Sequence, residues 1–172
     1  EILSLHEPPA LSGTASVTQV VGCYGVSTGE ITFIVDPAQP GVPTYQYSVN
    51  GGSPQPANIL TNLAGDITYD VMVEDNNGCS FISTVYLAEP AEIIYSASSS
   101  DYNGFEISCN GGSDGEITAT ATGGTGTVTY SLDGTNFQSS IDFTGLIAGT
   151  YTVTYKDING CTETEILSLN EP

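Results

Sequence analysis

The sequence predicts an all-β protein made of two tandem immunoglobulin-like β-sandwich repeats of about 82 residues each. Three observations predict this fold. Apolar residues alternate with threonine in segments such as 117–122 and 151–155, which is the pattern of a half-buried strand. Twenty glycines and nine prolines interrupt the chain too often for long helices. Several motifs also recur at a spacing of about 82 residues, which is the length of one small sandwich.

The repeat is clearest at the two ends of the chain. Residues 1–8 read EILSLHEP and residues 165–172 read EILSLNEP, and a weaker copy, STVYLAEP, lies midway at 83–90. The triplet Asn-Gly-Cys at 77–79 returns 82 positions later at 159–161. Motifs that recur while the stretches between them change in length are expected when the motifs are strands and turns and the variable stretches are loops.

The predicted organisation follows from this register. Residues 1–8 are the last strand and linker of a preceding repeat, residues 9–90 are the first sandwich, and residues 91–172 are the second. The Glu-Pro linkers are short and conformationally restricted, so neighbouring repeats are expected to be held in a semi-rigid, extended relation. The chain has no signal peptide and no apolar stretch of 18 residues, and we expect an interior segment of a longer exported protein.

Six strands are predicted in the second repeat, near 93–99, 116–122, 127–132, 137–144, 150–156 and 162–169. Gly78 and Gly160 follow asparagine and supply the positive φ that tight hairpin turns require. Leu146, Gly149 and Tyr151 are typical of the corner of immunoglobulin-like sandwiches, in which the tyrosine hydroxyl bonds back to the backbone. The counterpart of this corner at 63–69 is one residue longer, and a distorted corner is expected there.

Four cysteines fall two per repeat, which favours a disulfide framework and an oxidising, extracytoplasmic location. The predicted pairs are Cys23 with Cys79 and Cys109 with Cys161. These pairs require both cysteines of a repeat to lie at the same end of the sandwich, as they would if 137–144 formed one strand of a meander. In a strict seven-strand sandwich they can lie at opposite ends, and buried, reduced cysteines are the alternative.

The charge balance is extreme, with 20 acidic residues, a single basic residue (Lys156) and a net charge of −19. Binding to nucleic acid is excluded because nothing can neutralise phosphates, and attraction to an anionic membrane fails for the same reason. The acidic residues are spread along the chain, as on a solvated surface that resists aggregation.

An enzyme is not expected. The only histidine, His6, is replaced by asparagine at position 170 of the equivalent segment, and no Gly-x-Ser-x-Gly elbow is present. No cofactor is predicted.

Calcium is the remaining metal candidate. Its weak candidate ligands lie on two equivalent turns and one loop: Asp75, Asn77, Asp157, Asn159 and Asp114. Each site offers two or three oxygens where calcium takes six to eight, and the alternative is a hydrogen-bonded turn with no metal.

Carbohydrate binding is a further alternative, because exposed tyrosines can form a platform for sugar rings. The tyrosines that fit the core pattern least are Tyr24, Tyr86, Tyr95 and Tyr102. Tyrosines at strand periodicity are more often cross-strand pairs.

The second repeat resembles the SprB-type repeat of cell-surface adhesins in gliding bacteria. The resemblance rests on CNGGSDGEIT at 109–118, GGTG at 123–126, LIAGTYTV at 146–153 and DINGCT at 157–162. The first repeat is less similar, because Val-Pro-Thr-Tyr at 42–45 replaces the Gly-Gly-Thr-Gly loop.

The resemblance implies a stalk or spacer within a long tandem array. It further implies type IX secretion, display on the outer cell surface and a role in adhesion and gliding motility. The implied partners are neighbouring repeats, surface polysaccharide, and gliding and secretion machinery that contacts other regions of the protein. A module that binds glycan or calcium at the sandwich loops is the alternative function.

Overall fold

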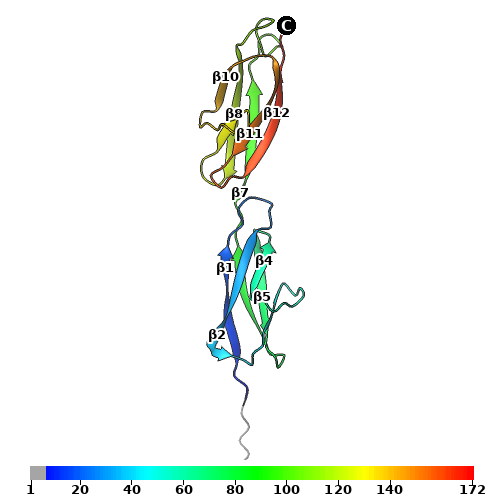
Figure 1. The fold of residues 1–172 in the computed structure, drawn as a ribbon, viewed down its shortest axis with the longest axis vertical. Helices are drawn as coiled ribbons and strands as arrows, with labels where there is room; N and C mark the ends of the chain where they lie inside the picture. Colours follow the sequence, from blue (N-terminus) through cyan, green and yellow to red (C-terminus); the bar gives the residue numbers. More distant parts are fainter. Residues whose placement is uncertain (1–6) are drawn as a thin grey trace, which may run out of the picture. The chain divides into compact units, whose positions relative to one another are not determined.

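The computed structural model describes residues 7–172, which form strands and turns and no helix (Figure 1). The predicted all-β class is therefore confirmed. The chain divides into two compact units, one ending at Glu89 and the other spanning Pro90–Pro172. The predicted leading segment 1–8 lies almost wholly outside the described residues. Its residues 7 and 8 belong to no strand.

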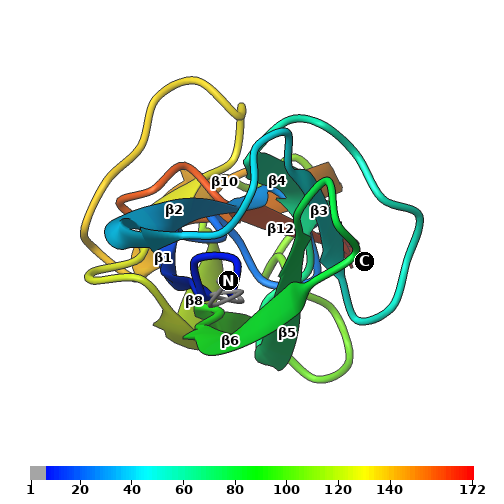
Figure 2. The same ribbon diagram turned by 90° about the horizontal axis from the view of Figure 1, so that it is seen from below.

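The first unit contains six strands in two antiparallel three-stranded sheets. The strands are β1 (Leu11–Gln19), β2 (Gly29–Pro40), β3 (Gln46–Val49), β4 (Ile59–Leu63), β5 (Ile67–Glu74) and β6 (Ser80–Leu87). One sheet has the order β1-β2-β4 and the other β3-β5-β6. In Figure 2, β2 and β4 lie in one layer and β5 and β6 in the other. Ile31 and Phe33 from the first sheet and Val71 and Val73 from the second are fully buried between the layers.

The second unit repeats this arrangement strand for strand. Its strands are β7 (Ala91–Ser99), β8 (Gly115–Gly124), β9 (Thr129–Ser131), β10 (Asp142–Leu146), β11 (Gly149–Lys156) and β12 (Thr162–Leu169). The sheets have the orders β10-β8-β7 and β12-β11-β9. Ile117 and Ala119 meet Val153 and Tyr155 across the core. Alternate residues in the middle of β8 and at the end of β11 are therefore apolar and buried, as the alternating sequence predicted.

The predicted strand at 137–144 is wrong in extent, because β10 begins only at Asp142. Gln138 forms an isolated bridge to Tyr130 in one sheet, whereas β10 pairs with β8 in the other. The Gln138 side chain explains the break, since its Nε2 donates to the carbonyls of Ser140 (3.1 Å) and Asp142 (3.0 Å). The segment therefore crosses between the sheets, and the unit is a sandwich rather than a meander.

Each unit has two poles, defined here by where its first strand begins and its last strand ends. In the second unit, Ala91 at the start of β7 pairs with Gly124, and a Cβ on Gly124 would lie 3.2 Å from the Asp157 side chain. This is the N-terminal pole. Leu169 ends β12 beside Gly115, at the opposite end of β8, which is the C-terminal pole.

The first unit has the same polarity. Leu11, Gly41 and Asp75 lie together at its N-terminal pole, because a Cβ on Gly41 would contact both neighbours. Leu87 lies against Gly29 at its C-terminal pole. The chain therefore enters each sandwich at one pole and leaves it at the other.

Candidate functional site

A buried carboxylate closes the N-terminal pole of the first unit. Asp75 follows β5 and is 5% exposed. Its Oδ2 accepts from the Val42 N–H at 2.9 Å, and its Oδ1 accepts from the N–H groups of Asn77 and Cys79, each at 2.9 Å. The Val42 N–H, with those of Cys79 and Asn77, holds the pKa of Asp75 below its ordinary value, although burial opposes this shift.

The second unit builds the same arrangement around Asp157, which is 4% exposed. Its Oδ2 accepts from the Thr125 N–H at 2.8 Å. Its Oδ1 accepts from the N–H groups of Asn159 and Cys161, each at 2.9 Å. The carboxylate thus joins the β11–β12 turn to the loop that follows β8 by three backbone hydrogen bonds.

In each repeat, a glycine with positive φ precedes the residue whose N–H donates to the buried aspartate. Gly124 precedes Thr125 with φ of 63°, and Gly41 precedes Val42 with φ of 62°. Both positions are also close to a side chain: a Cβ on Gly124 would lie 2.9 Å from Ile93. The loop at 42–45, which departs from Gly-Gly-Thr-Gly in sequence, therefore keeps the same backbone contact.

These turns do not fit a calcium site. The oxygens of Asp75 and Asp157 already accept backbone N–H groups, whose positive ends would face a cation placed there. Asp114 lies elsewhere, at the C-terminal pole, where its Oδ1 accepts from the Ser108 N–H at 3.2 Å. Ser108 holds the pKa of Asp114 below its ordinary value. Among residues 7–172, no three His, Cys, Asp or Glu side chains gather as a metal site requires.

Glu89 and Glu171, the glutamates of two Glu-Pro pairs, each bind the C-terminal pole of their own unit. Glu171 Oε2 accepts from the Gly111 N–H at 2.7 Å, and its Oε1 accepts from Asn110 Nδ2 at 3.1 Å. In the first unit, Glu89 Oε1 accepts from the Gly25 N–H at 2.8 Å. Sequence reasoning missed this contact. The available signal was that the Cys-x-Gly loop and the Glu-Pro pair both recur in each repeat.

The cysteines correct the predicted disulfide pairs. Cys79 and Cys109 are free and exposed, so Cys23–Cys79 and Cys109–Cys161 are not formed. The reason is the topology described above: the first cysteine of each repeat precedes β2 or β8 at the C-terminal pole, and the second precedes β6 or β12 at the N-terminal pole. Cys23 and Cys161 are disulfide-bonded, which is typical of proteins from oxidising compartments.

The tyrosine corner is present in both units. The Tyr151 hydroxyl donates to the Ile147 carbonyl at 2.9 Å, next to Leu146 and Gly149. In the first unit, the Tyr69 hydroxyl donates to the Ala64 carbonyl, also at 2.9 Å. The additional residue of the first corner is therefore accommodated with the hydrogen bond retained. The turn glycines Gly78 and Gly160 have φ of 79° and 86° and lie in the β5–β6 and β11–β12 turns.

Three of the four candidate sugar-binding tyrosines have partners within the protein. The Tyr86 hydroxyl donates to Asp66, and the Tyr102 hydroxyl donates to the Asp114 carbonyl. The Tyr95 ring lies 4.9 Å from that of the buried Tyr155. Tyr24 is 52% exposed. The four tyrosines are spread over both units, with Tyr24 and Tyr86 in the first and Tyr95 and Tyr102 in the second.

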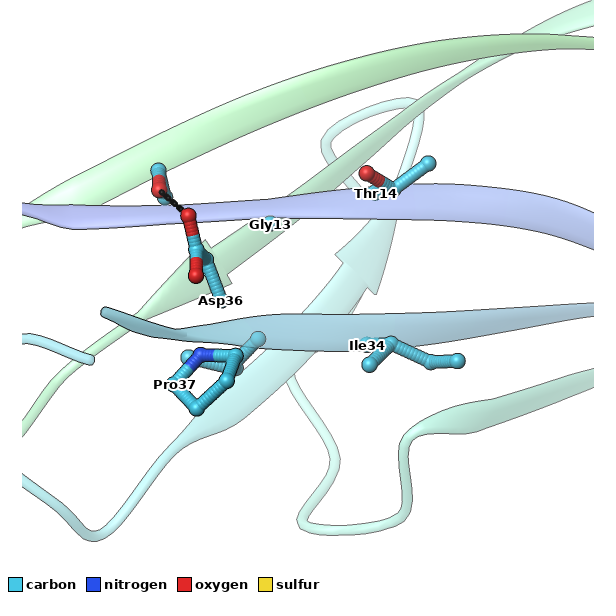
Figure 3. A pocket seen from close by; sticks show the side chains of 7 residues that line it. Gly13, Thr14, Ile34, Asp36 and Pro37 are labelled. Atoms are coloured by element: carbon cyan, nitrogen blue, oxygen red, sulfur yellow. Dashed lines mark hydrogen bonds between the residues drawn. The ribbon is translucent and has the colours of Figure 1, made fainter. Parts of the chain in front are cut away.

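The first unit also carries an open pocket of about 340 Å³ between β1 and β2. Its position follows from a bulge, because Leu11 pairs with Pro40 but Gly13 pairs with Val35. Figure 3 shows Asp36 and Pro37 on one side of it and Gly13 and Thr14 on the other. The equivalent β7–β8 pair also shifts register, between Ala91 and Ile94, but the chain there is shorter: position 130 follows position 117 by 13, whereas position 47 follows position 31 by 16.

In the described part of the chain, no helix has the length and apolar character needed to cross a membrane.

Comparison with protein families gives one match, to part of the second unit. Residues 106–137 match the family model described as the SprB repeat. No curated protein is significantly similar to the chain. Among solved structures, the three N-terminal domains of the bacteriophage RB49 Highly Immunogenic Outer Capsid protein (Hoc) are 17% identical, with a TM-score of 0.44 over 91% of this chain and 58% of that one. The extracellular cadherin domains 1–4 of Protocadherin Gamma B7 are 15% identical, with a TM-score of 0.28 over 94% of this chain and 51% of that one.

The chain therefore spans less than two thirds of the length of either solved structure. The family match begins at Glu106, in the loop at the C-terminal pole, and extends through β8 and β9. It confirms the resemblance inferred from the sequence for this part of the second repeat. Residues 106–137 of the second unit are thus similar to the SprB repeat.

Proposed function

We propose that this chain is a segment of a repetitive cell-surface adhesin and acts as a stalk that spaces a binding region away from the cell. The observation that carries the proposal is the polarity of each unit, which the chain enters at one pole and leaves at the other. Repeats of this kind extend an array with each copy, whereas a sandwich with both ends at one pole would fold the chain back.

The contact of the linker glutamate adds to this support. Glu89 is held by the Gly25 N–H of its own unit, immediately before Pro90. The hydrogen bond fixes the last residue before a proline, whose φ is itself restricted. A linker of this type favours a preferred direction of exit over free rotation, which suits a spacer.

The adhesin context rests on the SprB repeat at 106–137 and on the disulfide-bonded cysteines. Repeats of this type imply export by the type IX pathway, an extracellular location on the outer cell surface, and participation in gliding motility. Under this proposal the segment has no enzymatic activity, binds no nucleic acid and inserts into no membrane. The partners of this segment are the neighbouring repeats. Surface polysaccharide is a partner of the whole adhesin.

Small-angle X-ray scattering of the two-repeat chain tests the stalk. A ten-residue strand such as β8 spans about 33 Å, so two units in line, with their loops and linker, would have a maximum dimension of about 80 Å. A maximum dimension near that of a single sandwich would refute the proposal. The variant Glu89→Ala removes the acceptor for Gly25 and is expected to broaden the distance distribution, while the exposed Glu163→Gln is the matched control.

The pocket between β1 and β2 favours a second candidate function, a carbohydrate-binding module. Asp36 Oδ2 accepts from Ser12 Oγ at 3.4 Å, and its Oδ1 accepts from the Ala38 N–H at 2.9 Å. A carboxylate beside hydroxyls in an open pocket can accept hydrogen bonds from sugar hydroxyl groups. A glycan array tests this function. Binding that is lost in Asp36→Ala would favour the carbohydrate-binding module, whereas the absence of binding to any glycan would favour the stalk function alone.

A further inference from the structure

Each repeat presents one cysteine at each pole. In the first unit, Cys79 lies on the β5–β6 turn at the N-terminal pole, where its N–H donates to Asp75 at 2.9 Å. In the second unit, Cys109 lies in the loop at the C-terminal pole, where its carbonyl accepts from the Gly112 N–H at 2.9 Å. Both cysteines are free and exposed.

The two cysteines of one repeat cannot pair with each other. The eight residues of β12 separate the two poles of the second unit, which corresponds to about 23 Å along the strand. A disulfide requires Cα atoms within about 7 Å. Any disulfide formed by Cys79 or Cys109 therefore has to reach beyond its own sandwich.

The repeat register supplies the second observation. Cys79 corresponds to Cys161, and Cys109 corresponds to Cys23, on the N-terminal and C-terminal poles respectively. Both counterparts are disulfide-bonded. A disulfide therefore forms at the C-terminal-pole position in one repeat, at Cys23, and at the N-terminal-pole position in the other, at Cys161.

We propose that Cys79 and Cys109 form disulfides with the repeats that adjoin this segment, so that the C-terminal pole of one repeat is bonded to the N-terminal pole of the next. This inference rests on the proposed function, because it requires an array. Each proposed bond runs from a C-terminal pole to an N-terminal pole, so that this segment gains one covalent link to the repeat before it and one to the repeat after it. Such an array resists bending and separation at its linkers without a staple inside any sandwich.

The reaction is a thiol–disulfide exchange with a small or protein disulfide as oxidant. One cysteine thiolate attacks the oxidant and displaces a thiolate, which gives a mixed disulfide. The second cysteine thiolate then attacks this intermediate and releases the second thiolate. The two cysteines lose two electrons and two protons, and the oxidant is reduced to two thiols.

A head-to-tail fusion of the chain provides the test. Joining residues 9–172 directly behind Pro172 places EILSLNEP before Pro9, and this junction differs from the native EILSLHEP-Pro9 only in having Asn170 at the position of His6. The fusion is oxidised with oxidised glutathione at low protein concentration, alkylated, and mapped by mass spectrometry without reduction. The expected result is a peptide pair that joins Cys109 of the first copy to Cys79 of the second.

Thiol counting gives an independent readout. The single chain has two free cysteines, so two copies without a new bond would expose four thiols, whereas the proposed bond leaves two. The matched variant Cys109→Ser in the first copy is expected to expose three thiols and to retain the melting temperature of its sandwiches. Four free thiols in the folded fusion, bonds within one repeat, or bonds only between separate chains would overturn the inference. Scattering of the same fusion separates the two proposals, because an extended particle with four free thiols refutes the bond and leaves the stalk intact.

Discussion

Removing the Asp157 carboxylate is expected to destabilise the second unit strongly. In Asp157→Ala, the N–H groups of Thr125, Asn159 and Cys161 lose an acceptor that lies 2.8–2.9 Å away. A backbone donor left unsatisfied costs about 1–3 kcal/mol. Because turns at a pole admit water to part of the vacated space, we expect a total loss of about 2–4 kcal/mol.

Differential scanning calorimetry measures this loss as a shift of the second unit's transition. One kcal/mol corresponds to about 4–8 °C for a sandwich of this size, so the transition should fall by roughly 10–25 °C while that of the first unit stays in place. Asp157→Asn keeps one acceptor oxygen and should lose about half as much stability. The exposed Glu163→Gln serves as the control and should melt like the wild type.

The decisive comparison in this experiment is between melting in calcium and melting in chelator. If Asp157 is the hydrogen-bonded turn residue described above, melting is the same with calcium and with chelator. The reasoning is refuted if calcium raises the melting temperature of the wild type but not of Asp157→Ala. It is also refuted if Asp157→Ala and Glu163→Gln melt alike.

Three further expectations follow from the geometry. Gly115→Ala should cost about 1–3 kcal/mol in urea unfolding, because the new Cβ would lie 2.5 Å from Ile107 and 2.7 Å from Leu169; a wild-type midpoint would contradict it. Tyr151→Phe should cost about 1 kcal/mol through the lost bond to Ile147, measured by the same method, and an unchanged midpoint would show that this corner bond contributes nothing. Acid should destabilise the protein once the pH falls below about 4.5, in melts followed by circular dichroism. The pKa values of the hydrogen-bonded carboxyls are lowered on folding, so the unfolded chain takes up protons first; stability that rises in acid would contradict this. The carboxyls concerned are Asp75, Glu106, Asp114 and Asp133.

The sequence predicted those features that depend on local pattern. Alternation located β7, β8, β11 and β12 to within two residues at each end, and the turn glycines were placed because only a few residues tolerate positive φ. The single long strand at 137–144 was not predictable in this way. Its break depends on Gln138 bonding to two carbonyls, a local contact that competes with the ladder and leaves no periodic trace.

The disulfide prediction failed for a related reason. The even distribution of cysteines says how many fall in each repeat but not at which pole, and the pole is decided by whether the chain changes sheets after β9. Once Gln138 has ended one pairing and Asp142 has begun another in the opposite sheet, Cys109 and Cys161 are separated by the length of the sandwich. Local side-chain chemistry in a short loop thus determined a long-range covalent outcome.

The two loops that reach the buried aspartates explain how the repeats diverge in sequence while keeping one geometry. Val42 and Thr125 share no polar side-chain chemistry, yet each donates only its backbone N–H to the carboxylate below it. The side chain at this position is therefore free to change, whereas the preceding glycine is constrained by its φ and by its close neighbours. The aspartate is constrained as well, because its two oxygens serve donors from two different loops. Recognition by backbone groups thus lets a repetitive protein vary its loop surfaces from copy to copy while the poles of its sandwiches keep the same geometry.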